Sequence, residues 1–174
     1  MKRTTAHTNI TETFDEGLLA FREGEFSKSI CDLSKAIRLD PEKAVAYLTR
    51  GVAYMKTDRV NLALDDFEKA IELNPTYRRA YHLRGIAYHM KGAREKALRD
   101  FDKAIELDPE YGAAYLSRAN VHSEMGHTDE ADDDMEIVAR LTEKNIETFA
   151  NENNVWRSRH LRLEAEGILG EIER

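Results

Sequence analysis

ALDDFEKAIELNP at residues 63–75 and ALRDFDKAIELDP at residues 97–109 are two nearly identical stretches of this chain. Each follows a second shared stretch, YLTRGVAY at residues 47–54 and YHLRGIAY at residues 81–88. Gly51 and Gly85 are 34 residues apart, as are Phe67 and Phe101. A fixed period of this length is typical of stacked helical hairpins, so the sequence predicts a repeat protein.

The residues at fixed places in this period identify a family. An aromatic residue, Gly, Tyr, Ala, Phe, Ala and Pro recur in that order, and this order resembles the tetratricopeptide repeat (TPR) family. The resemblance implies an all-α fold, a right-handed α-solenoid of four TPR-like helical hairpins plus a C-terminal capping helix. A weaker copy ends at Pro41, and a fourth copy has lost its Gly and its Pro. Atypical terminal repeats are expected, because each has a stacking partner on one side only.

These copies divide the chain. We expect a frayed N-terminus at residues 1–9 and repeats at 10–43, 44–77, 78–111 and, in degenerate form, 112–143. Residues 144–174 form a C-terminal helical extension in this division. Asn9 and Glu12 suit a capping box that opens the first helix near Ile10. Prolines at the repeat boundaries separate one hairpin from the next.

The C-terminal part is less regular. The fourth returning helix is expected at residues 128–141, with Ala131, Met135 and Val138 directed inward. No proline ends it, so it can continue towards Phe149. After a break at residues 151–154, apolar residues recur at helical spacing up to Ile172, which predicts a final amphipathic helix. We expect this helix to cap the fourth repeat. Alternatively, it folds back into the groove of its own chain, or it enters the groove of a second molecule.

Composition excludes several classes of protein. The single cysteine, Cys31, rules out an intramolecular disulfide framework and favours a reducing compartment. We interpret Cys31 as a small buried apolar residue. No apolar run reaches membrane-spanning length, and no apolar segment follows the basic first residues, so we expect a cytoplasmic protein without membrane contact.

Charge is uneven along the chain. The net charge is −7, and carboxylates concentrate in residues 128–152. An acidic chain with one local basic segment, at residues 78–103, argues against binding of nucleic acid. Asp132, Asp133 and Asp134 point in different directions on a helix, so we interpret them as a solvated convex face rather than a cation site.

The first helix of each repeat carries a second stripe beside the one that its partner helix covers. In the TPR family this stripe lines the concave groove, where ligands usually lie. The resemblance therefore predicts a partner-binding groove, largely apolar, with a basic patch at the third repeat. Its residues are Phe14, Leu18, Phe21, Leu48, Val52, Met55, Arg79, His82, Ile86 and His89.

Signatures of catalysis are absent from the sequence. We find no glycine-rich phosphate loop, zinc-protease helix or paired-cysteine metal site, and we expect no enzyme, cofactor or metal. His82 and His89 are too far apart on one helix to share a metal. Next to Arg79, they either contact an anionic or aromatic group of a peptide or fill the groove as ordinary polar residues.

The best-known function of the family is a clamp for the acidic C-terminal tails of heat-shock chaperones. The resemblance assigns that clamp to Lys and Asn on the first groove helix, Asn on the second, and Lys and Arg on the third. The corresponding positions here hold Phe14, Leu18, Thr49, Arg79 and Leu83. Because only Arg79 carries the needed charge, the sequence argues against this clamp.

Two functions remain. The first is a non-catalytic adaptor whose apolar groove binds a peptide or helix of another protein, with an acidic flank on that partner. The second is a self-assembling, homo-oligomeric scaffold, in which another copy covers the groove or the C-terminal helix.

Overall fold

The computed structural model describes the backbone of residues 2–152 and the side chains of residues 11–148. This part of the chain is entirely helical and contains no strand. Its helices are α1 (Lys2–Arg22), α2 (Phe26–Leu39), α3 (Ala44–Lys56), α4 (Val60–Leu73), α5 (Arg78–Met90), α6 (Arg94–Leu107), α7 (Gly112–Met125) and α8 (Thr128–Glu152).

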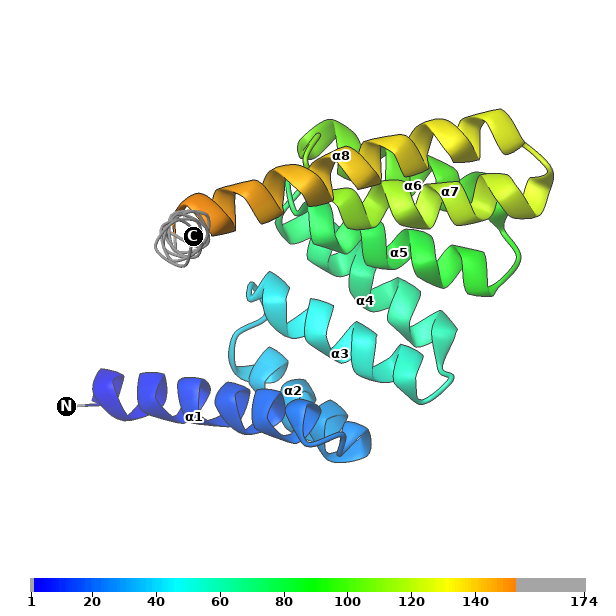
Figure 1. Ribbon diagram of the computed structural model, residues 1–174. Helices are drawn as coiled ribbons and strands as arrows, with labels where there is room; N and C mark the ends of the chain where they lie inside the picture. The colour runs from blue at the N-terminus through cyan, green and yellow to red at the C-terminus, as the bar shows by residue number, and fades with distance from the viewer. Residues whose placement is uncertain (1, 153–174) are drawn as a thin grey trace, which may run out of the picture.

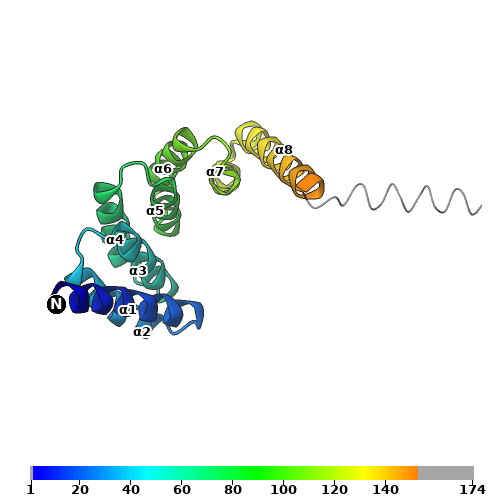
Figure 2. The same ribbon diagram turned by 90° about the vertical axis from the view of Figure 1, so that its left-hand side faces the viewer.

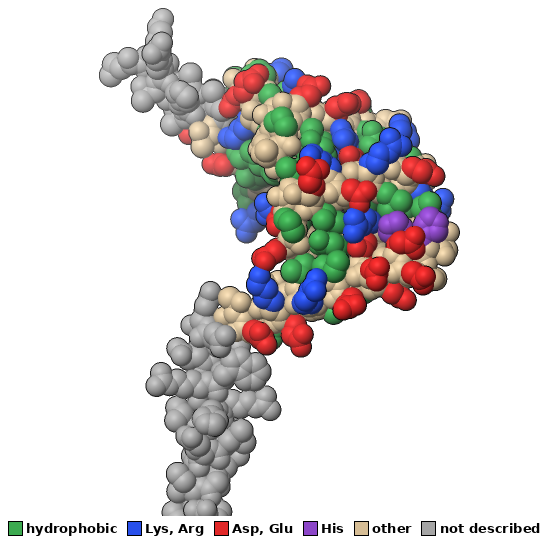
Figure 3. Space-filling model, turned by 90° about the horizontal axis from the view of Figure 1, so that it is seen from above, with side chains coloured by type: hydrophobic (Ala, Val, Ile, Leu, Met, Phe, Trp, Pro, Cys, Tyr) green, Lys and Arg blue, Asp and Glu red, His purple; other side chains and the backbone are tan. Residues whose placement is uncertain are grey.

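The helices pair into four hairpins that stack in chain order (Figure 1). Each odd-numbered helix packs on the helix that follows it, and α1, α3 and α5 also contact the next odd-numbered helix. Seen end-on, the helices follow an arc with α3, α5 and α7 on its inner side and α4 and α6 outside (Figure 2). From above, the end that contains α8 shows hydrophobic side chains among carboxylates and cations (Figure 3). The expected all-α solenoid is confirmed.

Close approach within a hairpin depends on a helical glycine. A Cβ atom on Gly85 would lie 2.6 Å from Cε1 of Phe101 and 3.2 Å from the carbonyl oxygen of Ala97. Gly51 has the same relation to Phe67 one repeat earlier. These contacts explain why both phenylalanines occur 34 residues apart with a glycine opposite each one.

Phe67 and Phe101 are completely buried because the next hairpin also covers them. Phe67 belongs to a core cluster with Ala80 and Ala87 of α5, and Phe101 to one with Val121 of α7. Burial of one large apolar side chain contributes roughly 1.5–3 kcal/mol. The core is therefore shared between neighbouring hairpins, and no hairpin completes it alone.

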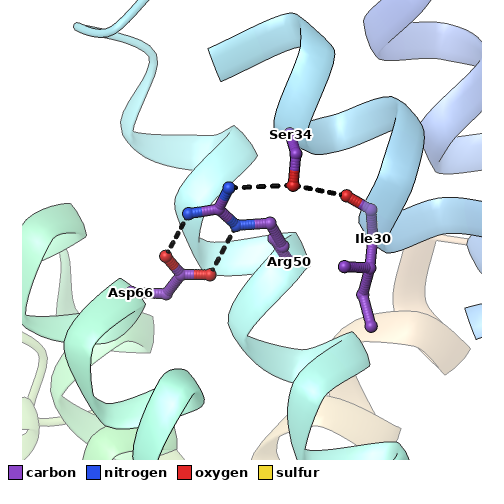
Figure 4. Close-up of polar contacts among 4 residues, drawn as sticks. All are labelled: Ile30, Ser34, Arg50 and Asp66. Atoms are coloured by element: carbon purple, nitrogen blue, oxygen red, sulfur yellow. Dashed lines mark hydrogen bonds and ion pairs between the residues drawn. The ribbon is translucent and has the colours of Figure 1, made fainter. Parts of the chain in front are cut away.

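A periodic set of ion pairs joins the two helices of each later hairpin. Arg50 donates two hydrogen bonds to the carboxylate of Asp66, at 2.8 and 2.7 Å, and a third to Ser34 Oγ of the preceding hairpin (Figure 4). Arg84 binds Asp100 in the same two-pronged way, at 2.8 and 2.7 Å. Because the interval is again 34 residues, the same pair recurs once more, as Arg118 with Asp134.

Two expectations for α8 are wrong. Asp134 is buried against Arg118, so it is not part of a solvated face, although Asp132 and Asp133 are exposed. Met135 is 45% exposed instead of directed inward. Its position corresponds to Phe101, but no further hairpin lies over it within the described residues.

Three further differences concern exposure and helix length. Helix α1 begins at Lys2 rather than near Ile10, so Asn9 lies inside the helix and not at its start. Extending an existing helix costs far less than nucleating one, and no Gly or Pro precedes residue 10 to stop it. Cys31 is exposed, not buried. Helix α8 continues to Glu152, as the missing proline allows, so the expected break at residues 151–154 does not begin at Asn151. The proposed C-terminal capping helix lies outside the described residues.

Replacement of Gly85 by Ala tests the close approach. Because the buried ring of Phe101 cannot move away freely, we expect Gly85→Ala to lower the free energy of unfolding by about 1–3 kcal/mol. Urea unfolding followed by circular dichroism measures this. The control is Gly112→Ala, whose new Cβ meets only Leu141 Cδ1 at 3.7 Å. Equal stability of the two variants would contradict the packing explanation.

Loss of one ion-pair partner tests the periodic pairs. Arg84→Ala leaves the carboxylate of Asp100 buried without its guanidinium, so we expect the free energy of unfolding to fall by about 2–4 kcal/mol. The matched control is Lys103→Ala, which removes an exposed ion pair with Glu106 and is expected to cost less than about 1 kcal/mol. A loss at Arg84 no larger than at Lys103 would show that the pair is dispensable.

Candidate functional site

The inner surface of the arc contains two neighbouring hollows. The first, of about 260 Å³, lies among α1, α3 and the start of α5. The second, of about 330 Å³, lies between α3 and α5. Val52 borders both, so the hollows form one groove with Val52 at its middle. The first hollow is lined by Leu18, Phe21, Val45, Leu48, Thr49, Val52, Tyr77 and Arg79. The second is lined by Val52, Met55, Lys56, Leu83, Ile86 and Met90.

The walls of the first hollow are apolar with one cation. Leu18 and Phe21 of α1 are half-buried, and Leu48 is 3% exposed. Arg79 is exposed and makes no ion pair with any described residue. Its guanidinium therefore remains available to a carboxylate that enters the hollow.

The second hollow has the same character. Met55 and Ile86 are half-buried, and Met90 is one of the exposed large hydrophobic residues. The cation here is Lys56, the last residue of α3. Methionines adapt their shape to different apolar groups, which suits a surface that receives a side chain from a partner.

Of the ten residues expected in the groove, seven border the hollows: Leu18, Phe21, Leu48, Val52, Met55, Arg79 and Ile86. Phe14 does not. It is buried in the cluster formed by Leu33, Ala36 and their neighbours, and the ammonium group of Lys43 lies 3.7 Å from the centre of its ring. This phenylalanine therefore packs the first hairpin against the second.

His82 is held between α5 and the last hairpin. Its side chain is 8% exposed; Nδ1 lies 3.0 Å from the Tyr111 hydroxyl and Nε2 lies 2.8 Å from Ser117 Oγ. Burial lowers the pKa of His82 to about 4, so the ring is neutral at pH 7. Neutral and enclosed, it is a packing residue and adds no charge to the groove.

His89 is also engaged by a residue of the next hairpin. Its Nε2 lies 3.0 Å from Glu124 Oε2, and Arg94 donates to the same carboxylate oxygen. The hydrogen bond from His89 is the main cause that lowers the pKa of Glu124. Once His82 and His89 are accounted for, Arg79 and Lys56 are the cations that border the hollows.

Six residues that line the hollows are not among the ten expected in the groove: Val45, Thr49, Lys56, Tyr77, Leu83 and Met90. Tyr77 precedes α5, and Thr49, Lys56, Leu83 and Met90 each lie one residue beyond a position assigned to the groove stripe. The signal was present in the sequence, since a hollow between two helices also receives side chains from the edges of their facing stripes.

Other kinds of site are not evident in this part of the chain. Among the described residues, no group of three His, Cys, Asp or Glu side chains is placed to hold a metal ion. None of the described helices combines the length and apolar character needed to cross a bilayer.

The environment of His82 predicts a pH dependence of stability. The unfolded chain binds a proton near pH 6.5, whereas folded His82 does so only near pH 4, so its stabilising contribution is complete above pH 6.5 and is lost as the pH falls towards 4. Between pH 7 and pH 4.5, we expect wild type to lose up to about 3 kcal/mol more than His82→Gln. Urea unfolding at both pH values measures the difference, and parallel losses would refute it.

Family comparison agrees with the observed repeats. A tetratricopeptide repeat model matches residues 44–77 and 79–111, and a second model of the same description matches residues 101–133. A rice protein (Oryza sativa subsp. japonica) named TPR repeat-containing thioredoxin TDX is 40% identical over 50 residues. That match covers 29% of this chain and 16% of the rice protein.

Solved structures with the same fold cover more of the chain. A crystal structure of MamA has a TM-score of 0.76 and 29% identity, over 80% of this chain and 81% of MamA. The first TPR of Spaghetti (RPAP3), bound to the HSP90 peptide SRMEEVD, has a TM-score of 0.65 and 25% identity, over 67% of this chain and 93% of that one. The second TPR domain of human RPAP3 is in complex with the HSP70 peptide SGPTIEEVD. Its structure has a TM-score of 0.64 and 27% identity, over 67% of this chain and 97% of that domain.

The matched repeats extend across residues 44–133, which is about half of the chain, and coincide with the hairpins from α3 into α8. Repeats of this kind generally serve protein–protein interaction rather than catalysis. From the sequence period, the stacked hairpins and these matches, the chain belongs to the tetratricopeptide repeat family.

Proposed function

We propose that this protein is a non-catalytic adaptor whose concave groove binds a segment of another protein. The observation that carries the proposal is the pair of apolar hollows joined at Val52, each with one cation at its border. The two RPAP3 domains, which share this fold, are in complex with short peptides, and this supports a peptide-sized ligand here.

The ligand that this groove favours has two apolar anchors. One anchor enters the hollow beside Leu18 and Phe21, and the other enters the hollow beside Met55 and Ile86. Burial of each large side chain contributes roughly 1.5–3 kcal/mol before the cost of association, so two anchors are compatible with micromolar affinity. Acidic residues next to the anchors pair with Arg79 and Lys56.

A chaperone-tail ligand fits this groove poorly. Phe14 and Leu18 occupy positions at which the resemblance to the family assigns polar clamp residues, and Phe14 is buried. Arg79 alone cannot hold two carboxylates of a peptide end. The proposed partner is therefore an internal apolar segment with acidic neighbours, not an acidic C-terminus.

A groove variant tests the proposal. Peptides are selected from a random library on the wild-type protein, and their affinities are measured by fluorescence anisotropy. We expect the selected peptides to carry two apolar anchors and acidic residues. Val52→Glu places a carboxylate between both hollows and is expected to weaken binding by more than about tenfold, which is about 1.4 kcal/mol. Val52 is half-buried, whereas Leu48 is too deeply buried for a clean test.

The matched control is Leu62→Glu, which changes an exposed residue of the outer helix α4. It is expected to leave peptide affinity unchanged. A further variant, Arg79→Glu, should weaken acidic peptides more than neutral ones and reduce the salt dependence of binding. Selected peptides that bind Val52→Glu as tightly as wild type would disprove the groove assignment.

A further inference from the structure

A third hollow of the molecule carries positive charge instead of apolar side chains. It has a volume of about 290 Å³ and lies between α5 and α6 of the third hairpin. We call it the cationic hollow, and its lining residues are Arg84, Tyr88, Lys96, Arg99 and Asp100. None of these residues borders the two hollows of the concave groove. Helix α6, which supplies three of them, lies on the outer side of the arc (Figure 2).

The positive charge of the cationic hollow is only partly neutralised. Its one carboxylate, that of Asp100, already accepts hydrogen bonds from Nε and Nη2 of Arg84. Lys96 and Arg99 are exposed, and neither forms an ion pair with a described carboxylate. Arg99 uses Nε to donate to the carbonyl oxygen of Glu95, at 3.2 Å, and both of its Nη atoms stay available. Two full positive charges are therefore free to meet an anion.

Arg84 also keeps one unused donor. In the two other repeats that contain this arginine, Nη1 binds an oxygen of the preceding hairpin: Arg50 binds Ser34 Oγ at 3.0 Å, and Arg118 binds Asp102 Oδ1 at 2.5 Å. The corresponding place before Arg84 holds Glu68, which is exposed and accepts no hydrogen bond from it. Nη1 of Arg84 therefore has no acceptor among the described residues.

Tyr88 gathers cations from both helices. The ammonium group of Lys96 lies 5.3 Å from the centre of its ring, and the guanidinium carbon of Arg84 lies 6.0 Å from it. Attraction between a cation and the face of an aromatic ring offsets part of the repulsion between like charges. The Tyr88 hydroxyl adds an O–H donor at the same place.

Comparison between the repeats shows that this charge is specific to the third one. The backbone and the Arg–Asp pair recur every 34 residues, so the equivalent positions can be read directly. The places of Lys96 and Arg99 are held by Leu62 and Asp65 in the second repeat, and by Glu130 and Asp133 in the fourth. The stacking of hairpins therefore does not require cations at these places.

We propose that the cationic hollow binds the phosphate group of a phosphorylated serine or threonine on a partner protein. Such a group carries a charge of about −1.5 to −2 and three acceptor oxygens, which matches several donors from different directions better than a carboxylate does. Arginine and lysine are the usual partners of phosphate. A volume near 290 Å³ is at the lower end of the roughly 300–1,000 Å³ of small-ligand sites, which suits one compact group.

The neighbouring repeats favour a single phosphate over a nucleic acid. A polyanion that crossed from the cationic hollow to the adjacent hairpins would meet carboxylates at the equivalent places, Asp65 on one side and Glu130 and Asp133 on the other. Like charges at these places oppose binding of an extended phosphate chain. The inference does not depend on the proposed function of the concave groove, because the two surfaces share no residue.

Paired peptides test the proposal on the full-length protein. A random peptide library with a fixed central phosphoserine is selected on wild type, and each selected peptide is also synthesised with unmodified serine. Fluorescence anisotropy measures both affinities. We expect the phosphorylated form to bind at least about tenfold more tightly, because only this form brings a second negative charge to the cations.

The decisive variant gives the third repeat the residues of the second. Lys96→Leu combined with Arg99→Asp is expected to reduce the preference for the phosphorylated form to less than about twofold. Both residues are exposed, and circular dichroism checks that helicity is retained. The matched control, Lys144→Leu combined with Arg140→Asp, makes the same change of net charge at exposed residues of α8 and is expected to keep the preference. Val52→Glu, in the concave groove, is also expected to keep it.

Two results would overturn the proposal directly. One is equal binding of the phosphorylated and unmodified peptides by wild type, and the other is a preference that survives in Lys96→Leu combined with Arg99→Asp. Competition separates the sources of the phosphate. Displacement of the phosphopeptide by an equal concentration of free O-phosphoserine would assign the cationic hollow to a small phosphorylated molecule. Displacement by an equal concentration of a single-stranded oligonucleotide would assign it to nucleic acid, and either result would refute a protein partner.

Discussion

The two central hairpins of this protein depend on their neighbours to bury Phe67 and Phe101 completely. Phe101 fills the space left by Gly85 within its own hairpin, but its burial is complete only because Val121 of the next hairpin lies against it. Stacking is therefore the condition under which any hairpin is stable, and a linear stack always has two ends. The open hollows of the inner face and the exposed residues at the end of the stack both lie where a neighbouring helix does not cover an apolar position.

The inner face exists because α3 and α5 have apolar residues on two sides while the outer helix of each hairpin covers one side. Part of the second side is used for contacts between neighbouring inner helices, as Phe14 and His82 show. The remainder stays open as the two hollows around Val52. The same residue pattern therefore produces both stacking contacts and open hollows, and the local shape decides which residue contributes to which.

Polar residues follow the same rule of shared contacts. Arg50 reaches Asp66 in its own hairpin and Ser34 in the preceding one, so one side chain connects three helices. His89 and Arg94 both meet Glu124 of the next hairpin. These contacts fix how neighbouring hairpins stack. They also engage His89, which the sequence assigns to the groove, with a carboxylate of the next hairpin.

The sequence by itself determined the period, the helical hairpins and the identity of the inner helices, because these depend on local spacing and on glycine and proline at fixed intervals. Seven of the ten residues assigned to the groove from the sequence line the two hollows, since one face of a helix follows from residue number. Only the tertiary structure decided that Phe14, His82 and His89 are engaged elsewhere, that Asp134 is buried and that Met135 is exposed. The physical reason is that burial and ionic pairing depend on which neighbour lies across each position, and that neighbour belongs to another hairpin or, at the end of α8, is absent from the described residues.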